Sequence, residues 1–179
     1  MKGIVFTEFL ELVSREFGEE MTDHIIEASD LPSGAAYTAV GTYDHAEMIT
    51  MVEKLSEATH RSVPDLLTAF GEHLLTRFAT RYPQFFVGIN SSFEFLERIE
   101  AHIHVEVRKL YPDAELPSIE CRQRSVGVLE LIYRSTRPLA AFAEGLMRGV
   151  IAYYDENIEV TRVVSADSGK YVRFELKRS

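Results

Sequence analysis

The sequence contains little cysteine and no hydrophobic run of membrane-spanning length. Cys121 is the one cysteine in 179 residues, which excludes an intramolecular disulfide and suits a reducing compartment. The stretch "MKGIVFTEFL" reaches Glu8 after too few apolar residues for the core of a signal peptide, and no later stretch approaches the length of a transmembrane helix. We therefore expect a cytoplasmic protein without a membrane partner.

Basic residues are also scarce, and they form no block. Residues 1–60 contain twelve acidic and three basic residues, whereas residues 61–179 contain sixteen of each, which gives a formal net charge of −9 at pH 7. Because binding to a phosphate backbone requires clustered Lys and Arg, nucleic acid is not an expected partner. Hydrophobic residues make up 46% of the chain, enough for a continuous core, and the length favours one domain over residues 1–179.

The motifs of several enzyme classes are absent. The chain has no glycine-rich phosphate loop, no Gly-x-Ser-x-Gly elbow, no His-Glu-x-x-His motif and no Cys-x-x-Cys pair. Its His, Cys, Asp and Glu residues nowhere show the spacing of a zinc site with three or four protein ligands. We do not expect an enzyme, and we interpret Cys121 as a half-buried thiol on a strand.

Hydrophobic periodicity predicts helices in the first two-thirds of the chain. Apolar residues recur there every three or four positions, and Gly18 and Pro83 mark helix ends. The predicted helices cover residues 6–18, 21–29, 44–60, 62–83 and 91–111. The last of these carries a single apolar stripe and ends just before Pro112.

The period changes after Pro112. Short runs rich in β-branched and aromatic residues predict strands over residues 118–123, 126–134, 158–164 and 170–176. The stretch "SADSGK" is expected to join the last two as a hairpin, and one helix is expected from about Pro138 to Tyr154. The fold class is therefore α+β, with a helical N-terminal part and a C-terminal antiparallel sheet crossed by one helix.

His102 and His104 lie in the last helix of the N-terminal part. At about 100° per residue, they fall on opposite flanks of the apolar stripe. His102 has charged neighbours such as Glu106, whereas His104 shares its side with Val107 and Tyr111. An apolar surround keeps an imidazole neutral, as metal ligation requires, so His104 is the better ligand candidate. Two interpretations stay open: a packed structural histidine, or the axial ligand of a haem iron, which brings its own equatorial ligands.

The run "YRSTR" places polar groups at alternate positions. In an extended segment Tyr133, Ser135 and Arg137 would point to one side, as two hydroxyls and a guanidinium that can bind carboxylates. A haem brings two propionates that would suit them. The alternative is an edge strand with a solvated polar face, which leads into a helix capped near Ser135 or Thr136.

Four stretches together resemble one known family. They are "MKGIVF" at the start, "RYPQFF" at 81–86, "HIHVEVRKLYPDAELP" at 102–117 and "YRSTR" at 133–137. In combination they look like the haem-based nitric-oxide/oxygen-binding family, H-NOX, whose animal members are sensor domains of soluble guanylate cyclase. The resemblance covers essentially the whole chain. Its most specific element is the Tyr-x-Ser-x-Arg run together with the upstream histidine.

The resemblance implies a haem b between the helical part and the sheet. His104 would be the proximal ligand of the iron, and Tyr133, Ser135 and Arg137 would bind the propionates. Pro117 matches the proline that presses on the porphyrin and distorts it. Some bacterial members also hold zinc at cysteines near the C-terminal hairpin, but "SADSGK" and its flanks contain no cysteine, so structural zinc is not expected.

The resemblance also bears on the distal pocket. Members that hold oxygen stably carry a tyrosine at the position that matches Phe142, and the other distal positions match Val5, Phe9 and Leu74. An apolar pocket offers no hydrogen bond to dioxygen, whereas nitric oxide (NO) and carbon monoxide (CO) bind ferrous haem without one. A hydrogen bond to a charged group is worth about 1.5–3 kcal/mol. The resemblance therefore implies selectivity for NO against O2.

The function implied is that of a haem-based gas sensor for NO, which also binds CO. By analogy with the family, NO weakens the bond between iron and His104, and its rupture frees the 91–111 helix. The expected partner is a separate histidine kinase or a cyclic-di-GMP enzyme, either a diguanylate cyclase or a phosphodiesterase. The alternative from the residues alone is a scaffold or binding domain without haem that holds another acidic ligand.

Overall fold

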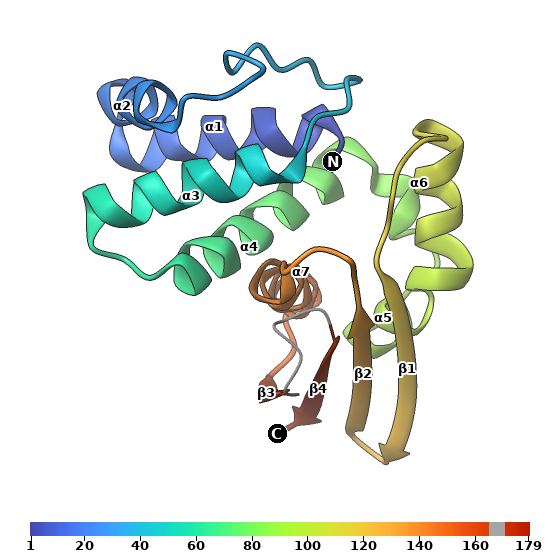
Figure 1. Ribbon diagram of the computed structural model, residues 1–179. Helices are drawn as coiled ribbons and strands as arrows, with labels where there is room; N and C mark the ends of the chain where they lie inside the picture. The colour runs from blue at the N-terminus through green and yellow to red at the C-terminus, as the bar shows by residue number, and fades with distance from the viewer. Residues whose placement is uncertain (165–170) are drawn as a thin grey trace.

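Helices form the first part of the chain (Figure 1). The computed structural model describes residues 1–164 and 171–179. The first helices are α1 (Gly3–Phe17), α2 (Glu19–Ser29), α3 (His45–Thr59) and α4 (Val63–Arg81). Gly18 ends α1, and Ser62 Oγ accepts a hydrogen bond from the Asp65 N–H at the start of α4. The helices predicted before residue 84 are confirmed, with ends that differ by up to three residues.

The segment predicted as one helix over residues 91–111 is divided, so that prediction is wrong in detail. A short helix, η1 (Pro83–Phe85), leads to α5 (Ser92–Glu97), the π-helical turn η2 (Ile99–Ile103) and α6 (His104–Leu110). Within η2, the N–H of Ile103 donates to the carbonyl of Arg98, and the N–H of His104 donates to that of Ile99. These bonds span five residues instead of four, which widens the turn directly before His104.

The C-terminal part is an antiparallel sheet with one crossing helix. The described strands are β1 (Ser118–Ser125), β2 (Val128–Arg134), β3 (Ile158–Val164) and β4 (Tyr171–Arg178), in the order β1-β2-β4-β3. The helix α7 (Ala140–Tyr153) connects β2 to β3. This arrangement confirms the predicted α+β class. The predicted hairpin turn "SADSGK" lies outside the described residues.

The helix α7 packs closely against α4 and lies between it and the sheet (Figure 1). Glycine makes this approach possible, because a Cβ atom on Gly145 would lie 2.0 Å from the Thr68 carbonyl oxygen. Likewise, a Cβ atom on Gly71 would lie 2.4 Å from the carbonyl oxygen of Phe142. The first two turns of α7 are thereby held against the middle of α4.

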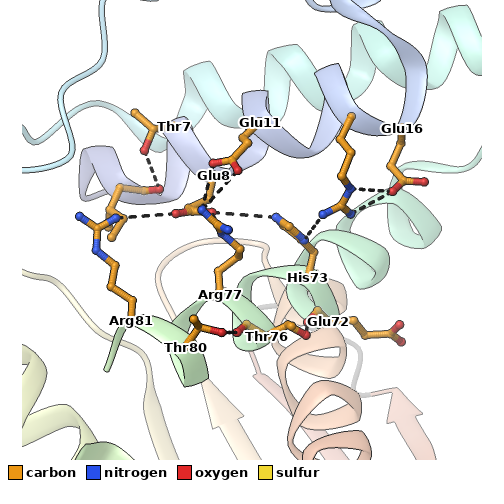
Figure 2. Close-up of polar contacts among 12 residues, drawn as sticks. Thr7, Glu8, Glu11, Glu16, Glu72, His73, Thr76, Arg77, Thr80 and Arg81 are labelled. Carbon is orange, nitrogen blue, oxygen red and sulfur yellow. Dashed lines mark hydrogen bonds and ion pairs between the residues drawn. The ribbon is translucent and has the colours of Figure 1, made fainter. Parts of the chain in front are cut away.

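A buried carboxylate joins α1 to α4 (Figure 2). Glu8 has a side chain that is only 5% exposed, and its Oε2 accepts a hydrogen bond of 2.8 Å from Arg77 Nε. His73 Nε2 and Arg81 Nη1 each lie 3.9 Å from this carboxylate, and Arg15 Nη1 lies 3.3 Å from His73 Nδ1. Burial, followed by the charge of Arg15, lowers the pKa of His73. The pairing lets a glutamate occupy the apolar interface between the two helices.

Glu8→Gln is expected to lower the free energy of unfolding by about 1.5 kcal/mol, because the buried acceptor of the hydrogen bond from Arg77 loses its negative charge and only a neutral amide oxygen remains. Urea denaturation followed by far-UV circular dichroism measures the change. Glu11→Gln is the matched control, since Glu11 also pairs with Arg77 but is 56% exposed, so its loss should cost less than about 0.5 kcal/mol. Equal effects of the two substitutions would contradict a special role for the buried carboxylate.

Candidate functional site

A cavity of about 670 Å³ lies where α1, α4, α6, α7 and β2 meet. Its walls are mostly apolar, and its volume falls in the range of sites for small molecules and cofactors. Among the described residues, no helix is long and apolar enough to span a membrane. The described chain also shows no group of three or more His, Cys, Asp and Glu that could hold a bare metal ion. The cavity is therefore the candidate ligand site.

His104 opens α6 and lines the cavity. Its side chain is 11% exposed, and its Nδ1 lies 3.4 Å from Glu100 Oε1. Burial lowers the pKa of His104, and the neighbouring carboxylate of Glu100 opposes this change only in part. The imidazole is therefore neutral near pH 7 and has an electron pair to donate. His102, in contrast, is exposed and does not belong to the described lining of the cavity.

Tyr133, Ser135 and Arg137 of the "YRSTR" run line the cavity, although they do not form one strand. Tyr133 belongs to β2 and is buried, whereas Ser135 and Arg137 follow the end of the strand at Arg134. Ser135 Oγ accepts a hydrogen bond of 3.0 Å from the backbone N–H of Arg137. Burial raises the pKa of Tyr133, so its hydroxyl stays protonated and can donate. The turn after β2, and not the strand alternation, brings the three groups together.

Arg137 holds a carboxylate at the edge of the cavity. Its Nη1 donates to the Glu115 carbonyl oxygen at 3.1 Å, and its Nη2 donates to the Glu115 side chain. The guanidinium is 13% exposed, but the Glu115 carboxylate is 78% exposed and projects into solvent. An exposed glutamate thus occupies a position where another carboxylate could bind in its place. Glu115 was not predicted, because the contact joins segments 22 residues apart and no local pattern marks it.

The remaining candidates lie in different places. Val5, Leu74, Phe142 and Pro117 line the cavity. Phe9 is not among the described lining residues, since it lies one turn beyond Val5 on α1, where the helix faces the core. Its ring packs edge-on against Phe70, with 5.2 Å between the ring centroids. Phe9 therefore supports the wall of the cavity from behind.

Three aromatic residues complete the lining of the cavity, and the sequence patterns did not assign them to a site. Tyr82, Phe85 and Phe86 come from the stretch "RYPQFF" and its helix η1. The Tyr82 hydroxyl lies 3.1 Å from that of Tyr111, just after α6. The cluster of aromatic residues around Pro83 was the available signal, because such a group has few places to pack outside a core or a ligand site.

Cys121 lies on β1 and is not among the described residues that line the cavity. Its Sγ–H donates to the Leu96 carbonyl oxygen at 3.5 Å, and burial raises the pKa of Cys121 to about 12. The thiol therefore stays protonated and unreactive at neutral pH. This agrees with its interpretation as a half-buried thiol on a strand.

Comparison with known proteins identifies the family. A family model described as Haem-NO-binding matches residues 2–162. The chain belongs to this haem-NO-binding family, H-NOX. The resemblance inferred from the sequence motifs is thereby confirmed. Among the curated proteins, none matches this chain.

Solved H-NOX structures share the fold over the full length. The H-NOX protein from K. algicida, in its unliganded Fe(II) form, is 40% identical with a TM-score of 0.95, and the match covers 100% of this chain and 97% of that one. The H-NOX from Shewanella woodyi, bound to IWP-051 in the Fe(II)CO state, is also 40% identical, with a TM-score of 0.85 and coverages of 100% and 95%. The S. oneidensis H-NOX in the Fe(II)NO state is 24% identical with a TM-score of 0.92 over 100% and 99%, which shows the common fold.

The residues of the H-NOX cavity fit a haem. His104 presents a buried, neutral imidazole whose Nδ1 makes no hydrogen bond to any described residue. Arg137 already binds a carboxylate at the cavity edge, and Tyr133 and Ser135 add hydroxyls beside it. Between them the apolar walls suit a flat macrocycle. One histidine on one side and carboxylate-binding groups at the edge are the features that a haem requires of a protein.

Proposed function

We propose that this H-NOX protein is a cytoplasmic sensor of NO that binds the gas, and also CO, at a ferrous haem b in the cavity. The observation that carries the proposal is the shared cavity of His104, a buried neutral imidazole, and Arg137, a guanidinium that already holds a carboxylate. The description of the family as Haem-NO-binding supports NO as the signal. The Fe(II)CO state of the 40% identical S. woodyi relative supports CO as a second ligand.

Each candidate residue has a role in this proposal. When bound, the haem would supply a ferrous iron that binds a diatomic gas. His104 would hold the iron through its imidazole, and Arg137 would exchange the carboxylate of Glu115 for a propionate. Tyr133 and Ser135 would donate to the propionates. Pro117, on the loop between α6 and β1, would press on the macrocycle.

Selectivity for NO against O2 would come from three apolar side chains that line the cavity. Val5, Leu74 and Phe142 carry no hydrogen-bond donor, and Phe9 packs behind them. A diatomic ligand that needs a hydrogen bond to stabilise negative charge finds none from these side chains. NO and CO do not depend on such a bond. The proposal therefore includes weak binding of O2.

The signal would pass to a separate partner. We infer that residues 1–179 act as one sensor domain and that the partner is a histidine kinase or a cyclic-di-GMP enzyme. The absence of catalytic motifs supports a sensor that is not itself an enzyme. His104 is the first residue of α6, directly after the π turn, so a change at its imidazole would reach η2 and α6 first. Two states of this segment would be the minimum for allosteric control.

Absorption spectroscopy of protein produced with an adequate supply of haem tests the proposal. We expect a Soret band in the ferrous protein, a shift of that band with NO and with CO, and no shift on exposure to air. A second candidate function is the binding of some other acidic ligand, which the contact between Arg137 and Glu115 also favours. A protein that never shows a Soret band would exclude the haem sensor and leave this second function.

Arg137→Ala is expected to speed the loss of haem about tenfold, because one charge-assisted hydrogen bond of about 1.5 kcal/mol to a propionate disappears. Transfer of haem to excess apomyoglobin measures this rate. Arg134→Ala is the matched control, since Arg134 belongs to the same run but is exposed and pairs with Glu120. An unchanged rate in Arg137→Ala would contradict the role of Arg137 in binding propionate.

A further inference from the structure

Glu100 connects the segment formed by η2 and α6, which carries His104, to the sheet. It lies in η2, about one turn before His104, and its side chain is 38% exposed. Its Oε1 accepts a hydrogen bond of 2.5 Å from the backbone N–H of Ile119 and lies 3.4 Å from His104 Nδ1. Ile119 pairs with Tyr133 across β1 and β2. One carboxylate oxygen therefore faces both the histidine and the strand pair that carries Tyr133.

The contact between Glu100 and His104 favours one tautomer of the imidazole. A neutral imidazole carries its hydrogen on either Nδ1 or Nε2. With the hydrogen on Nε2, the electron pair of Nδ1 would face the negatively charged oxygen of Glu100, and the two would repel each other. With the hydrogen on Nδ1, a donor faces an acceptor, and no other described residue accepts a hydrogen bond from this buried atom. The carboxylate thus favours hydrogen on Nδ1 and leaves the electron pair on Nε2.

We propose that Glu100 is a positioning residue for His104. It fixes the tautomer with hydrogen on Nδ1, presents the electron pair of Nε2 to the cavity and makes that nitrogen a stronger donor. Only the last effect, exerted on iron, rests on the proposed function. Carboxylates that hold the second nitrogen of a ligating histidine act in this way at metal sites in general.

The distance of 3.4 Å is long for a charge-assisted hydrogen bond, which is typically about 2.7–2.9 Å. When Nε2 donates its electron pair to a metal, the hydrogen on Nδ1 becomes more positive. The distance between His104 Nδ1 and Glu100 Oε1 is therefore expected to shorten when a metal binds at Nε2. The bond to Ile119 prevents Glu100 from turning away into solvent, although its side chain is partly exposed. Glu100 is thereby held within reach of the imidazole by β1.

Two substitutions at Glu100 separate positioning from simple structural support. Glu100→Gln keeps an amide oxygen that can accept from Ile119 but removes the charge, whereas Glu100→Ala removes both. In the ferrous haem-loaded protein, resonance Raman spectroscopy reports the stretching frequency between iron and histidine. We expect this frequency to fall in both variants and haem to dissociate about tenfold faster in Glu100→Ala. Glu97→Gln is the control, because Glu97 is exposed on α5 and should leave the frequency unchanged.

The outcomes distinguish this inference from the proposed function. An unchanged frequency in both Glu100 variants, in protein that shows a normal Soret band, overturns the positioning role while the haem sensor stands. If no Soret band forms, nitrogen-15 NMR of the full haem-free chain still decides the tautomer, with the His104 signal identified by its loss in His104→Gly. Hydrogen on Nδ1 in the wild type, and a mixture of tautomers in Glu100→Ala, is the expected result. Hydrogen on Nε2 in the wild type overturns the proposal.

Discussion

His104→Gly is expected to abolish the absorption spectrum of the five-coordinate ferrous haem and to reduce haem retention at least a hundredfold. The substitution removes the one buried imidazole among the described residues that line the cavity, since His45 also lines it but is only half-buried. Because the lost side chain leaves space of its own size, added imidazole should enter and restore the spectrum. Absorption spectra with and without imidazole measure both effects.

His102→Gly is the matched control for this experiment. It places a glycine two positions away in the same helical segment, so it carries a similar backbone cost, but His102 is exposed and does not belong to the described lining of the cavity. The control should keep the spectrum of the wild type. If His104→Gly keeps its ferrous spectrum without imidazole, or if His102→Gly loses it, the assignment of the axial ligand to His104 is wrong.

Local sequence patterns were sufficient for most of the fold. Apolar residues at helical spacing defined the segments that became α1 to α4, and the change to β-branched runs after Pro112 located the strands. The π turn at Ile99–Ile103 was missed, because the apolar stripe through Ile99 and Ile103 is equally compatible with a regular α-helix. The wider turn depends on which carbonyl each N–H reaches, and the apolar pattern does not specify that choice.

The residues of the candidate site also fall into two groups, those that local sequence patterns identify and those that they do not. His104 was separated from His102 by its apolar neighbours, and the structure buries the first and exposes the second. In contrast, Glu100 and Glu115 act on His104 and Arg137 through contacts that depend on where β1 and the loop before it lie. A single charged residue on an otherwise polar surface gives no local signal of such a contact. The hydrophobic periodicity of one sequence therefore does not predict which individual side chains, far apart in the chain, will pair.

Phe142→Tyr is expected to raise the affinity for O2 by about tenfold to a hundredfold. Phe142 lies in the first turn of α7, lines the cavity and has its ring centroid 5.1 Å from that of Phe70. A hydroxyl at this position would place a hydrogen-bond donor beside the apolar side chains of Val5 and Leu74, and such a bond to a charged acceptor is worth about 1.5–3 kcal/mol. Absorption spectra of the ferrous protein, titrated with O2, measure the affinity.

The gases separate a specific hydrogen bond from a general change of the pocket. CO does not depend on a hydrogen bond, so Phe142→Tyr should change the affinity for CO less than it changes the affinity for O2. Phe142→Leu is the matched control, because it alters the shape of the pocket next to Phe70 without adding a donor, and it should leave O2 binding as weak as in the wild type. Equal gains for O2 and CO in Phe142→Tyr would show that space, and not the hydroxyl, limits binding. A wild-type protein that already binds O2 stably in air would refute the claim that the apolar lining of Val5, Leu74 and Phe142 selects against it.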